Sequence, residues 1–297
     1  MTAIVKPVTN TPRAILGEGS IWHPAENVLY WIDITGEKLH RYDPEKEENQ
    51  TVDMGSMIGT VVPSEGKYSV VVALETGIFG IGKNGEKELL HEYPDAEPSD
   101  NRFNDGKCDP AGRFWIGTMS KKETKGAGNL YSFNGKELKL KQPDVTISNG
   151  IVWSADTKTM YYIDTPEMAV FAYDFNKESG EISNRRIAFK VPETLGYPDG
   201  MSIDEEDMLW IALWNGAAVI RFNPATGEVL EKIELPALNV TSCAFGGEEL
   251  KTLYITTAKQ GMTEKQIEQY PLAGSLFVVE CEVKGTPANM INQDLKI

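Results

Sequence analysis

The chain has 297 residues, of which 41% are hydrophobic and 25% are charged, a balance typical of folded globular proteins rather than disordered ones. Its formal net charge of -15 argues against binding to nucleic acids or to anionic membrane surfaces, because both need a basic surface. The acidic surplus fits a soluble protein and leaves room for a cation site.

The N-terminal stretch MTAIVKPVTNTPRA lacks the long apolar core of a signal peptide, and no run approaches the length of a transmembrane helix. The three cysteines lie far apart and form no CxxC pair, which is typical of reduced thiols in a cytosol. We therefore expect a cytoplasmic protein with no nucleic-acid partner and no membrane partner.

Six hydrophobic runs recur along the chain. In order they are LYWID, YSVVVAL, RFWIG, MYYID, MLWIA and TLYIT, centred on Trp31, Val71, Trp115, Tyr162, Trp210 and Tyr254. Successive centres are 40, 44, 47, 48 and 44 residues apart. Such a period predicts the four-stranded blade of a β-propeller.

Further short strands are predicted after five of these runs, at KLHRYD, NLYSFNG, AVFAYDF, AVIRFN and SLFVVE. No window of a dozen residues shows helical periodicity. The predicted fold class is therefore all-β, a six-bladed β-propeller, with residues 1–297 forming a single domain. Because the ring must close, we expect the N-terminal segment AIVKPV to pair with strands near the C-terminus in one shared blade.

A short polar element, usually ending in Gly, precedes the runs. The first strand of each propeller blade lines the central channel, so these elements are expected at the channel mouth. Counting back from the run centres places one residue of each unit in the channel: Glu18, Ile58, Asp105, Asn149, Asp199 and Ser242.

Converging carboxylates raise one another's pKa or require a cation between them. Glu18, Asn149 and Asp199 offer hard oxygen ligands, which suit Ca²⁺ first, then Mg²⁺ or Mn²⁺, with Zn²⁺ and Fe²⁺ as further candidates. The alternative is that Gly after Asp or Asn only marks a turn at the start of a strand. The matched repeat positions favour a site for one divalent metal ion in the central channel.

The remaining short motifs do not indicate a functional site. GIGKNG at residues 80–85 matches GxGxxG in letters, but no long helix follows, so it is interpreted as a hairpin turn. DFNKESGE near Asp174 has the wrong spacing for a calcium loop and is interpreted as a surface turn. No GxSxG occurs and none of the three histidines takes a channel position, so acid–base chemistry would fall to carboxylates or to a metal-bound water.

Several longer motifs occur in a characteristic order, namely LGEGSIW, RFNDGKCDPAGRFWIGTM, SNGIVWSAD, YYID, ISNRR, YPDGMSIDEEDMLWIA and TSCAFGG. Together they resemble the SMP-30/gluconolactonase/regucalcin-like family, which includes the luciferin-regenerating-enzyme-like proteins. The resemblance runs from about residue 13 to the end of the chain. It implies a six-bladed propeller that acts as a metal-dependent sugar lactonase.

The resemblance also implies roles for single residues. Glu18, Asn149 and Asp199 would hold the metal. The substrate's hydroxyl or carbonyl groups would contact Arg102 and Asn104, with Asp105 beside them. In mammalian members an acidic run follows GTM and a Glu there helps to hold the sugar. Here that place is taken by Lys122, so either Glu123 moves in by one residue or the contacts to the substrate differ.

We therefore expect metal-dependent hydrolysis of sugar lactones (aldonolactones) to aldonic acids, with a metal-activated water and Asp199 as the catalytic base. One alternative is an esterase or phosphotriesterase on the same scaffold, although the channel has no histidine. A second is a non-enzymatic calcium-binding regulatory protein, in which Arg102 and Asn104 would have no role. A third, an interaction platform, fits poorly with polar groups that converge inside the channel.

Overall fold

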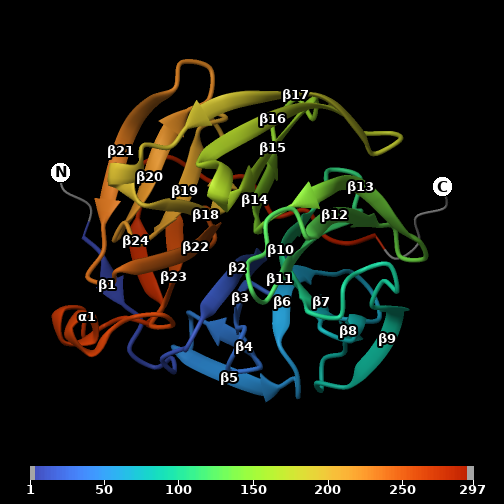
Figure 1. Cartoon of the computed structure of the whole chain (residues 1–297). Coiled ribbons are helices and arrows are strands. Elements are labelled where there is room, and N and C mark those ends of the chain that lie inside the picture. Colours follow the sequence, from blue (N-terminus) through green and yellow to red (C-terminus); the bar gives the residue numbers. More distant parts are fainter. Residues whose placement is uncertain (1–3, 293–297) are drawn as a thin grey trace.

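The computed structural model describes residues 4–292 and contains six four-stranded antiparallel sheets arranged around a central axis (Figure 1). In each sheet the neighbouring strands are joined in sequence order, as hairpins are, apart from one strand supplied by the N-terminal segment. The six-bladed β-propeller predicted from the repeat is confirmed.

Blades 1 to 3 occupy the first half of the chain. Blade 1 contains β2 (Gly17–His23), β3 (Val28–Asp33), β4 (Lys38–Asp43) and β5 (Glu48–Asp53). Blade 2 contains β6 (Ile58–Pro63), β7 (Val70–Leu74), β8 (Gly77–Ile81) and β9 (Lys87–Glu92). Blade 3 contains β10 (Asn101–Cys108), β11 (Phe114–Ser120), β12 (Gly128–Phe133) and β13 (Leu138–Val145).

Blades 4 to 6 complete the ring. Blade 4 contains β14 (Ser148–Trp153), β15 (Thr159–Asp164), β16 (Ala169–Asn176) and β17 (Glu181–Lys190). Blade 5 contains β18 (Tyr197–Ile203), β19 (Leu209–Trp214), β20 (Ala218–Asn223) and β21 (Glu228–Glu234). Blade 6 contains β22 (Asn239–Gly246), β23 (Thr252–Ala258), β24 (Phe277–Glu280) and, at its edge, β1 (Lys6–Pro7).

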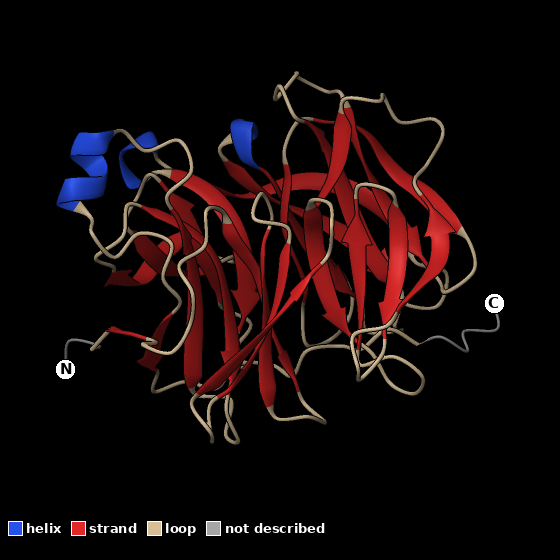
Figure 2. Cartoon of the chain, turned by 90° about the horizontal axis from the view of Figure 1, so that it is seen from below, coloured by secondary structure: helices blue, strands red, loops and turns tan. Residues whose placement is uncertain are grey.

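Helical segments are few and short in the described part of the chain. They are the 3₁₀ turns η1 (Thr165–Glu167) and η2 (Glu193–Leu195) and the helix α1 (Glu264–Gln269). Figure 2 shows helical segments near the upper end of the blades in that view. Among the described residues, no helix has the length and apolar character needed to cross a membrane.

The six aromatic or apolar runs of the repeat form the second strand of each blade, where they are buried between neighbouring sheets. Trp31, Trp115 and Trp210 at the run centres are each at most 1% exposed. Two motifs interpreted as turns from the sequence are also hairpin turns: residues 82–86 join β8 to β9, and residues 177–180 join β16 to β17.

The N-terminal segment pairs with a strand from near the C-terminus in blade 6. Lys6 of β1 pairs with Val278 of β24, and Pro7 pairs with Phe277. Residue 3, the first of the segment AIVKPV, lies outside the described residues. The innermost strands also touch where the ring closes, because the Ser20 Oγ of β2 lies 3.1 Å from the Ser242 Oγ of β22. Blade 6 therefore combines strands from both ends of the sequence.

The innermost strand of every blade has a break in its pairing register at or beside the channel position found by counting. A β-bulge of this kind re-aims side chains, which explains how a polar residue can face the axis from within an otherwise buried strand. The glycine that follows is needed for packing. A Cβ on Gly150 would lie 2.5 Å from the Met201 Cβ of the next blade, and a Cβ on Gly200 would lie 2.8 Å from the Thr241 carbonyl oxygen.

These glycines lie inside the strands, so the alternative of a turn at the start of a strand does not account for them. At Gly150 and Gly200 the inner strand of the next blade lies too close for a side chain. The polar residue and its glycine are thus two parts of one feature: the bulge directs the first side chain to the axis, and the glycine lets the next blade pack against it.

Candidate metal and substrate site in the central channel

A cavity of about 350 Å³ lies at the end of the channel where η1 is found. It contains six of the seven site residues expected from the sequence. Its lining consists of Glu18, Arg102, Asn104, Glu123, Asn149, Thr165, Asp199 and Gln260, together with Leu16, Ile34, Met119, Ile147, Pro166, Tyr197 and Trp214. The inner strands of blades 1, 3, 4 and 5 supply most of the polar groups.

Two carboxylates on the inner strands of different blades face this cavity. Glu18 of β2 is 7% exposed and Asp199 of β18 is 5% exposed. Burial, and then the nearby charge of Asp105, raises the pKa of Glu18 to about 8. Burial, then the charges of Glu18 and Asp105, raises the pKa of Asp199 well above its ordinary value. The protein therefore brings negative charges together without enough positive charge of its own to balance them.

Asn149 of β14 presents the third candidate ligand. Its side chain is 4% exposed, and its Nδ2 donates a hydrogen bond to the Thr165 Oγ1 at 2.7 Å. Its Oδ1 lies on the side of Asn104, whose Nδ2 is 3.2 Å away. The amide is thus held in one orientation by partners on both sides.

The donor set fits a hard divalent cation. Glu18, Asn149 and Asp199 offer carboxylate and amide oxygens only, the ligand types that Ca²⁺, Mg²⁺ and Mn²⁺ prefer. Within residues 4–292, no group of three or more His, Cys, Asp or Glu side chains is placed to hold a metal ion, so the set depends on the Asn149 amide as its third member. A cation at this place would also balance the charges of the two carboxylates.

Arg102 and Asn104 of β10 lie beside the candidate ligands. The Arg102 Nη1 donates to the Asn104 Oδ1 at 2.6 Å and to the Phe103 carbonyl oxygen at 2.9 Å. The Asn104 Nδ2 also donates to the Ser148 carbonyl oxygen at 2.7 Å. Both side chains are less than 10% exposed, so the protein holds a positive charge and an amide in place at the cavity wall.

Glu123 and Lys122 are placed differently. Glu123 lines the cavity. Burial lowers the pKa of Arg102, and the negative charge of Glu123 acts in the opposite direction. The Lys122 side chain is 77% exposed, and its Nζ lies 3.4 Å from the Asp100 Oδ1, outside the cavity lining. The structure thus brings six of the expected residues together and leaves Lys122 outside.

Other channel residues do not line this cavity. Asp105 accepts a hydrogen bond from its neighbour Gly106 N at 2.7 Å and acts on the site through its charge, whereas Ile58 and Ser242 bring no charge to the axis. None of the three histidines lines the cavity either. The counting rule therefore located the channel strands correctly, and three of its six positions border the cavity.

Several lining residues were not singled out from the sequence. Thr165 follows the YYID motif directly, and Tyr197 precedes the PDG motif that holds Asp199. Adjacency to a motif named in the sequence analysis was a usable signal for both. Trp214 is the last residue of β19 and Gln260 lies two residues after β23, and nothing in their spacing marks them.

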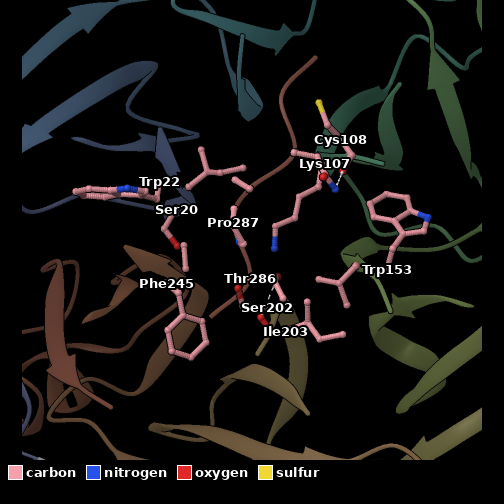
Figure 3. Close-up of a pocket in the computed structure, with 15 residues that line it drawn as sticks. Ser20, Trp22, Lys107, Cys108, Trp153, Ser202, Ile203, Phe245, Thr286 and Pro287 are labelled. Atoms are coloured by element: carbon pink, nitrogen blue, oxygen red, sulfur yellow. Dashed lines mark hydrogen bonds between the residues drawn. The ribbon is translucent and has the colours of Figure 1, made fainter. Parts of the chain in front are cut away.

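A second, smaller cavity of about 70 Å³ lies further along the same inner strands (Figure 3). Its lining includes Ser20, Lys107 and Ser202, each two or three residues beyond a channel position, and the segment 286–289. Figure 3 shows the Lys107 side chain reaching into it, where its Nζ donates to the Met201 carbonyl oxygen. No carboxylate lines this cavity, so the candidate ligands belong to the larger one.

The chain is similar to known proteins over nearly its full length. Residues 16–259 match the family model described as SMP-30/Gluconolactonase/LRE-like region. A Bacillus subtilis protein named as a candidate sugar lactone lactonase, YvrE, is 38% identical over 275 residues, covering 92% of this chain and 94% of the relative. Regucalcin from Xenopus laevis is 37% identical over 271 residues, covering 89% and 90%.

A solved structure is also similar to this chain over nearly its full length. The calcium-binding protein regucalcin from Agrobacterium tumefaciens superimposes with a TM-score of 0.92, at 26% identity, covering 98% of each chain. The family match covers more than half of the chain, and the relatives match it almost from end to end. This chain therefore belongs to the SMP-30/gluconolactonase/LRE-like family.

Proposed function

We propose that the protein hydrolyses sugar lactones to aldonic acids with the help of one divalent cation, Ca²⁺ being the first choice. The observation that carries the proposal is the grouping of Glu18, Asn149 and Asp199 with Arg102 and Asn104 in one cavity. The names of two similar proteins agree with it, since YvrE is named for sugar lactones and the Agrobacterium regucalcin is named as calcium-binding.

Glu18, Asn149 and Asp199 would hold the cation. A bound divalent cation supplies positive charge that polarises a carbonyl group and makes a water molecule more acidic. The cavity volume of about 350 Å³ is in the lower part of the range for small-molecule sites and suits a lactone of five or six carbons.

Arg102, Asn104 and Glu123 would orient the lactone. Arg102 is fixed by its bonds to Phe103 and Asn104, so its guanidinium can meet a substrate oxygen without first being ordered. Glu123, an acceptor at the rim, suits the sugar hydroxyl groups. Substrate would thus be held by groups that the fold has already placed.

Asp199 is the proposed base. Water attacks the carbonyl carbon while one Asp199 oxygen accepts its proton, the ring C–O bond breaks, and the proton passes to the departing ring oxygen, which becomes a hydroxyl group. A carboxylate that binds a cation through one oxygen is a weaker base, so the second oxygen must remain available for the proton. The product is an acid that ionises, so the reaction releases one proton overall.

Acid release provides the test. Metal-stripped protein is mixed with glucono-, galactono-, xylono- and arabinono-lactones in a pH-indicator assay, with Ca²⁺, Mg²⁺, Mn²⁺, Zn²⁺ or Fe²⁺ added back singly. We expect hydrolysis above the spontaneous rate that returns with one of these ions. Cation binding without turnover of any lactone would instead favour a calcium-binding protein that is not an enzyme, and turnover of aryl esters or phosphotriesters alone would favour the esterase alternative.

Asp199→Ala should abolish lactone hydrolysis, because the variant loses both a cation ligand and the base. Loss of a catalytic base alone typically lowers the rate by a factor of about 10²–10⁴. The rate of hydrolysis at saturating cation checks this, with Glu205→Gln in the adjacent exposed turn as a control that keeps full activity. Hydrolysis by Asp199→Ala near the wild-type rate would remove Asp199 from the mechanism.

A further inference from the structure

The Thr165 hydroxyl lies between two of the candidate cation ligands. It accepts a hydrogen bond from the Asn149 Nδ2 at 2.7 Å and donates one to the Pro198 carbonyl oxygen at 2.7 Å. A hydroxyl group has a single proton, and here that proton is used by Pro198. Thr165 can therefore only accept from Asn149, so the amide must turn its NH₂ group toward Thr165 and its oxygen away.

The bonds on the other side of Asn149 require the same orientation. The Arg102 Nη1 can only donate, so the oxygen of Asn104 faces it at 2.6 Å. The Asn104 Nδ2 then points to the Asn149 Oδ1 at 3.2 Å. Donors and acceptors thus run in one direction from Arg102 through Asn104, Asn149 and Thr165 to the peptide that precedes Asp199.

Thr165 itself is held firmly by its backbone. Its N–H donates to the Ile147 carbonyl oxygen at 3.1 Å, and its carbonyl oxygen accepts from the Met168 N at 3.0 Å. The preceding residue, Asp164, binds the backbone N–H groups of Thr146 and Ile147 through its carboxylate. The hydroxyl group consequently sits at a fixed point between β14 and β18.

The repeat supplies an internal comparison. Thr118 and Thr257 stand three residues after their run centres, as Thr165 does after Tyr162. Their hydroxyls donate within their own blades, Thr118 to the Asn129 carbonyl oxygen at 3.3 Å and Thr257 to the Ser275 carbonyl oxygen at 2.7 Å. In blade 4 the hydroxyl instead joins a channel amide to the inner strand of blade 5. This bonding is therefore not a general requirement of the propeller repeat.

We infer that Thr165 is a positioning residue for the cation site: its hydroxyl fixes the Asn149 amide so that Oδ1, the only atom of that amide able to bind a cation, faces the channel. The inference rests on the proposed function, because it assumes that Asn149 is a ligand. Without the hydroxyl, the NH₂ group of Asn149 loses its acceptor, and only the longer bond from the Asn104 Nδ2 at 3.2 Å still orients the amide. Partners that orient a ligand in this way typically contribute a factor of about 10–100 to metal affinity.

The test compares metal-stripped wild-type protein with Thr165→Val, Thr165→Ser and Thr257→Val. Thr165→Val keeps the shape of the side chain and removes the hydroxyl, whereas Thr165→Ser keeps the hydroxyl. The dissociation constant for Ca²⁺ is measured by calorimetric titration, and the melting temperature is measured with chelator and with excess Ca²⁺. We expect Thr165→Val to bind Ca²⁺ about 10- to 100-fold more weakly, and Thr165→Ser and Thr257→Val to bind it like the wild type.

The outcomes separate the two claims. Equal Ca²⁺ affinity in the wild type and Thr165→Val overturns the positioning role and leaves the cation site standing. Loss of affinity in Thr165→Ser as large as in Thr165→Val also overturns it, because the hydroxyl would then not be the cause. Absence of binding of Ca²⁺, Mg²⁺, Mn²⁺, Zn²⁺ and Fe²⁺ in the wild type overturns the cation site itself. If Thr165→Val does not fold in chelator, Thr165→Ala takes its place, and a ratio of affinities near one between Thr165→Ser and Thr165→Ala overturns the inference.

Discussion

Glu123 has a backbone φ of 55°, in the left-handed region that few residues other than glycine adopt readily. Its N–H donates to the Ser120 carbonyl oxygen at 2.9 Å, which closes a tight turn after β11. This turn directs the side chains of Lys122 and Glu123, which are neighbours in the sequence, to different places. The Glu123 side chain reaches the cavity, and the Lys122 side chain lies beside Asp100.

Glu123→Gln should therefore raise the KM for a sugar lactone with little change in kcat, because it weakens the contact proposed between Glu123 and the sugar, and Glu123 has no part in the proposed proton transfer. A loss of about 1.4 kcal/mol corresponds to a tenfold higher KM. Lys122→Gln is the control in the same turn and should leave both constants unchanged. An equal rise in KM for both variants would show that the effect comes from the turn and not from the carboxylate.

His40 gives a prediction for stability. It is 2% exposed, stacks on Trp31 with 3.9 Å between ring centroids, and accepts hydrogen bonds at Nδ1 from Thr51 and Asn49. Burial lowers its pKa to about 4, and the opposing charges of Asp33 and Lys38 act on it more weakly. The neutral ring is thus the form that fits the folded protein.

Because the folded pKa lies below the unfolded value of 6.5, the unfolded chain takes up this proton first as the pH falls. The free energy of unfolding should decrease by about 3 kcal/mol from this group between pH 7 and pH 4. Denaturant titrations at several pH values check this, and His40→Gln should remove that part of the slope. A His40→Gln variant with the wild-type pH dependence would contradict the assignment, with His91→Gln as the control for loss of an imidazole.

At the scale of elements, the turn between the first and second strands is built around a buried aspartate in blades 3 and 5. Asp204 is 0% exposed, and its Oδ1 accepts from the N–H groups of Glu206 and Met208 at 3.0 Å each. Its Oδ2 accepts from the Trp210 Nε1 at 2.9 Å and the Arg221 Nε at 2.7 Å. In blade 3, Asp109 makes the same kinds of bond to its turn and to Trp115.

Asp204→Asn should lower the free energy of unfolding by about 3 kcal/mol, because the amide turns a donor toward the Trp210 and Arg221 donors and leaves Arg221 without its buried carboxylate. Chemical denaturation provides the measurement. Glu205→Gln, a change to an exposed carboxylate of the same turn, should have almost no effect. A similar loss in both variants would mean that the turn responds to charge in general.

The sequence revealed these elements to different degrees. The spacing of Trp31, Trp115 and Trp210 predicted the second strands because every blade buries an aromatic or apolar side chain at the centre of its second strand. Glu18, Asn149 and Asp199 could be found by counting because the bulge recurs at the same step of every inner strand. The role of Thr165 could not, since Thr118 and Thr257 occupy the same position and their hydroxyls bond elsewhere. The residue type alone did not reveal which group a threonine hydroxyl would form its hydrogen bonds with.

At the scale of the whole molecule, the candidate ligands come from blades 1, 4 and 5, so one cation would join sheets that are far apart in the sequence. Its binding energy then adds to the stability of the folded ring. At a free concentration 100 times the dissociation constant, a ligand specific for the folded state stabilises it by about 2.7 kcal/mol.

Removal of the cation with a chelator should accordingly lower the melting temperature by several degrees, and added Ca²⁺ should restore it. Glu18→Gln should lose this response because one charged ligand is gone, while Glu205→Gln should keep it. Melting curves recorded with chelator and with Ca²⁺ for the three proteins decide the point. A full response in Glu18→Gln would exclude Glu18 from the site.

The recurring bulge also gives the scaffold six equivalent places from which a side chain can face the axis, and three of them carry the ligands proposed for the cation. Ile58 and Ser242 occupy the same structural step as Glu18 and Asn149 but contribute no charge. Replacing either by an acidic residue would change the charge in the channel near the proposed cation site, while the backbone that presents the side chain stays the same. Substitutions at these six channel positions could thus change the ion bound or the reaction one residue at a time, while the fold of the blades stays the same.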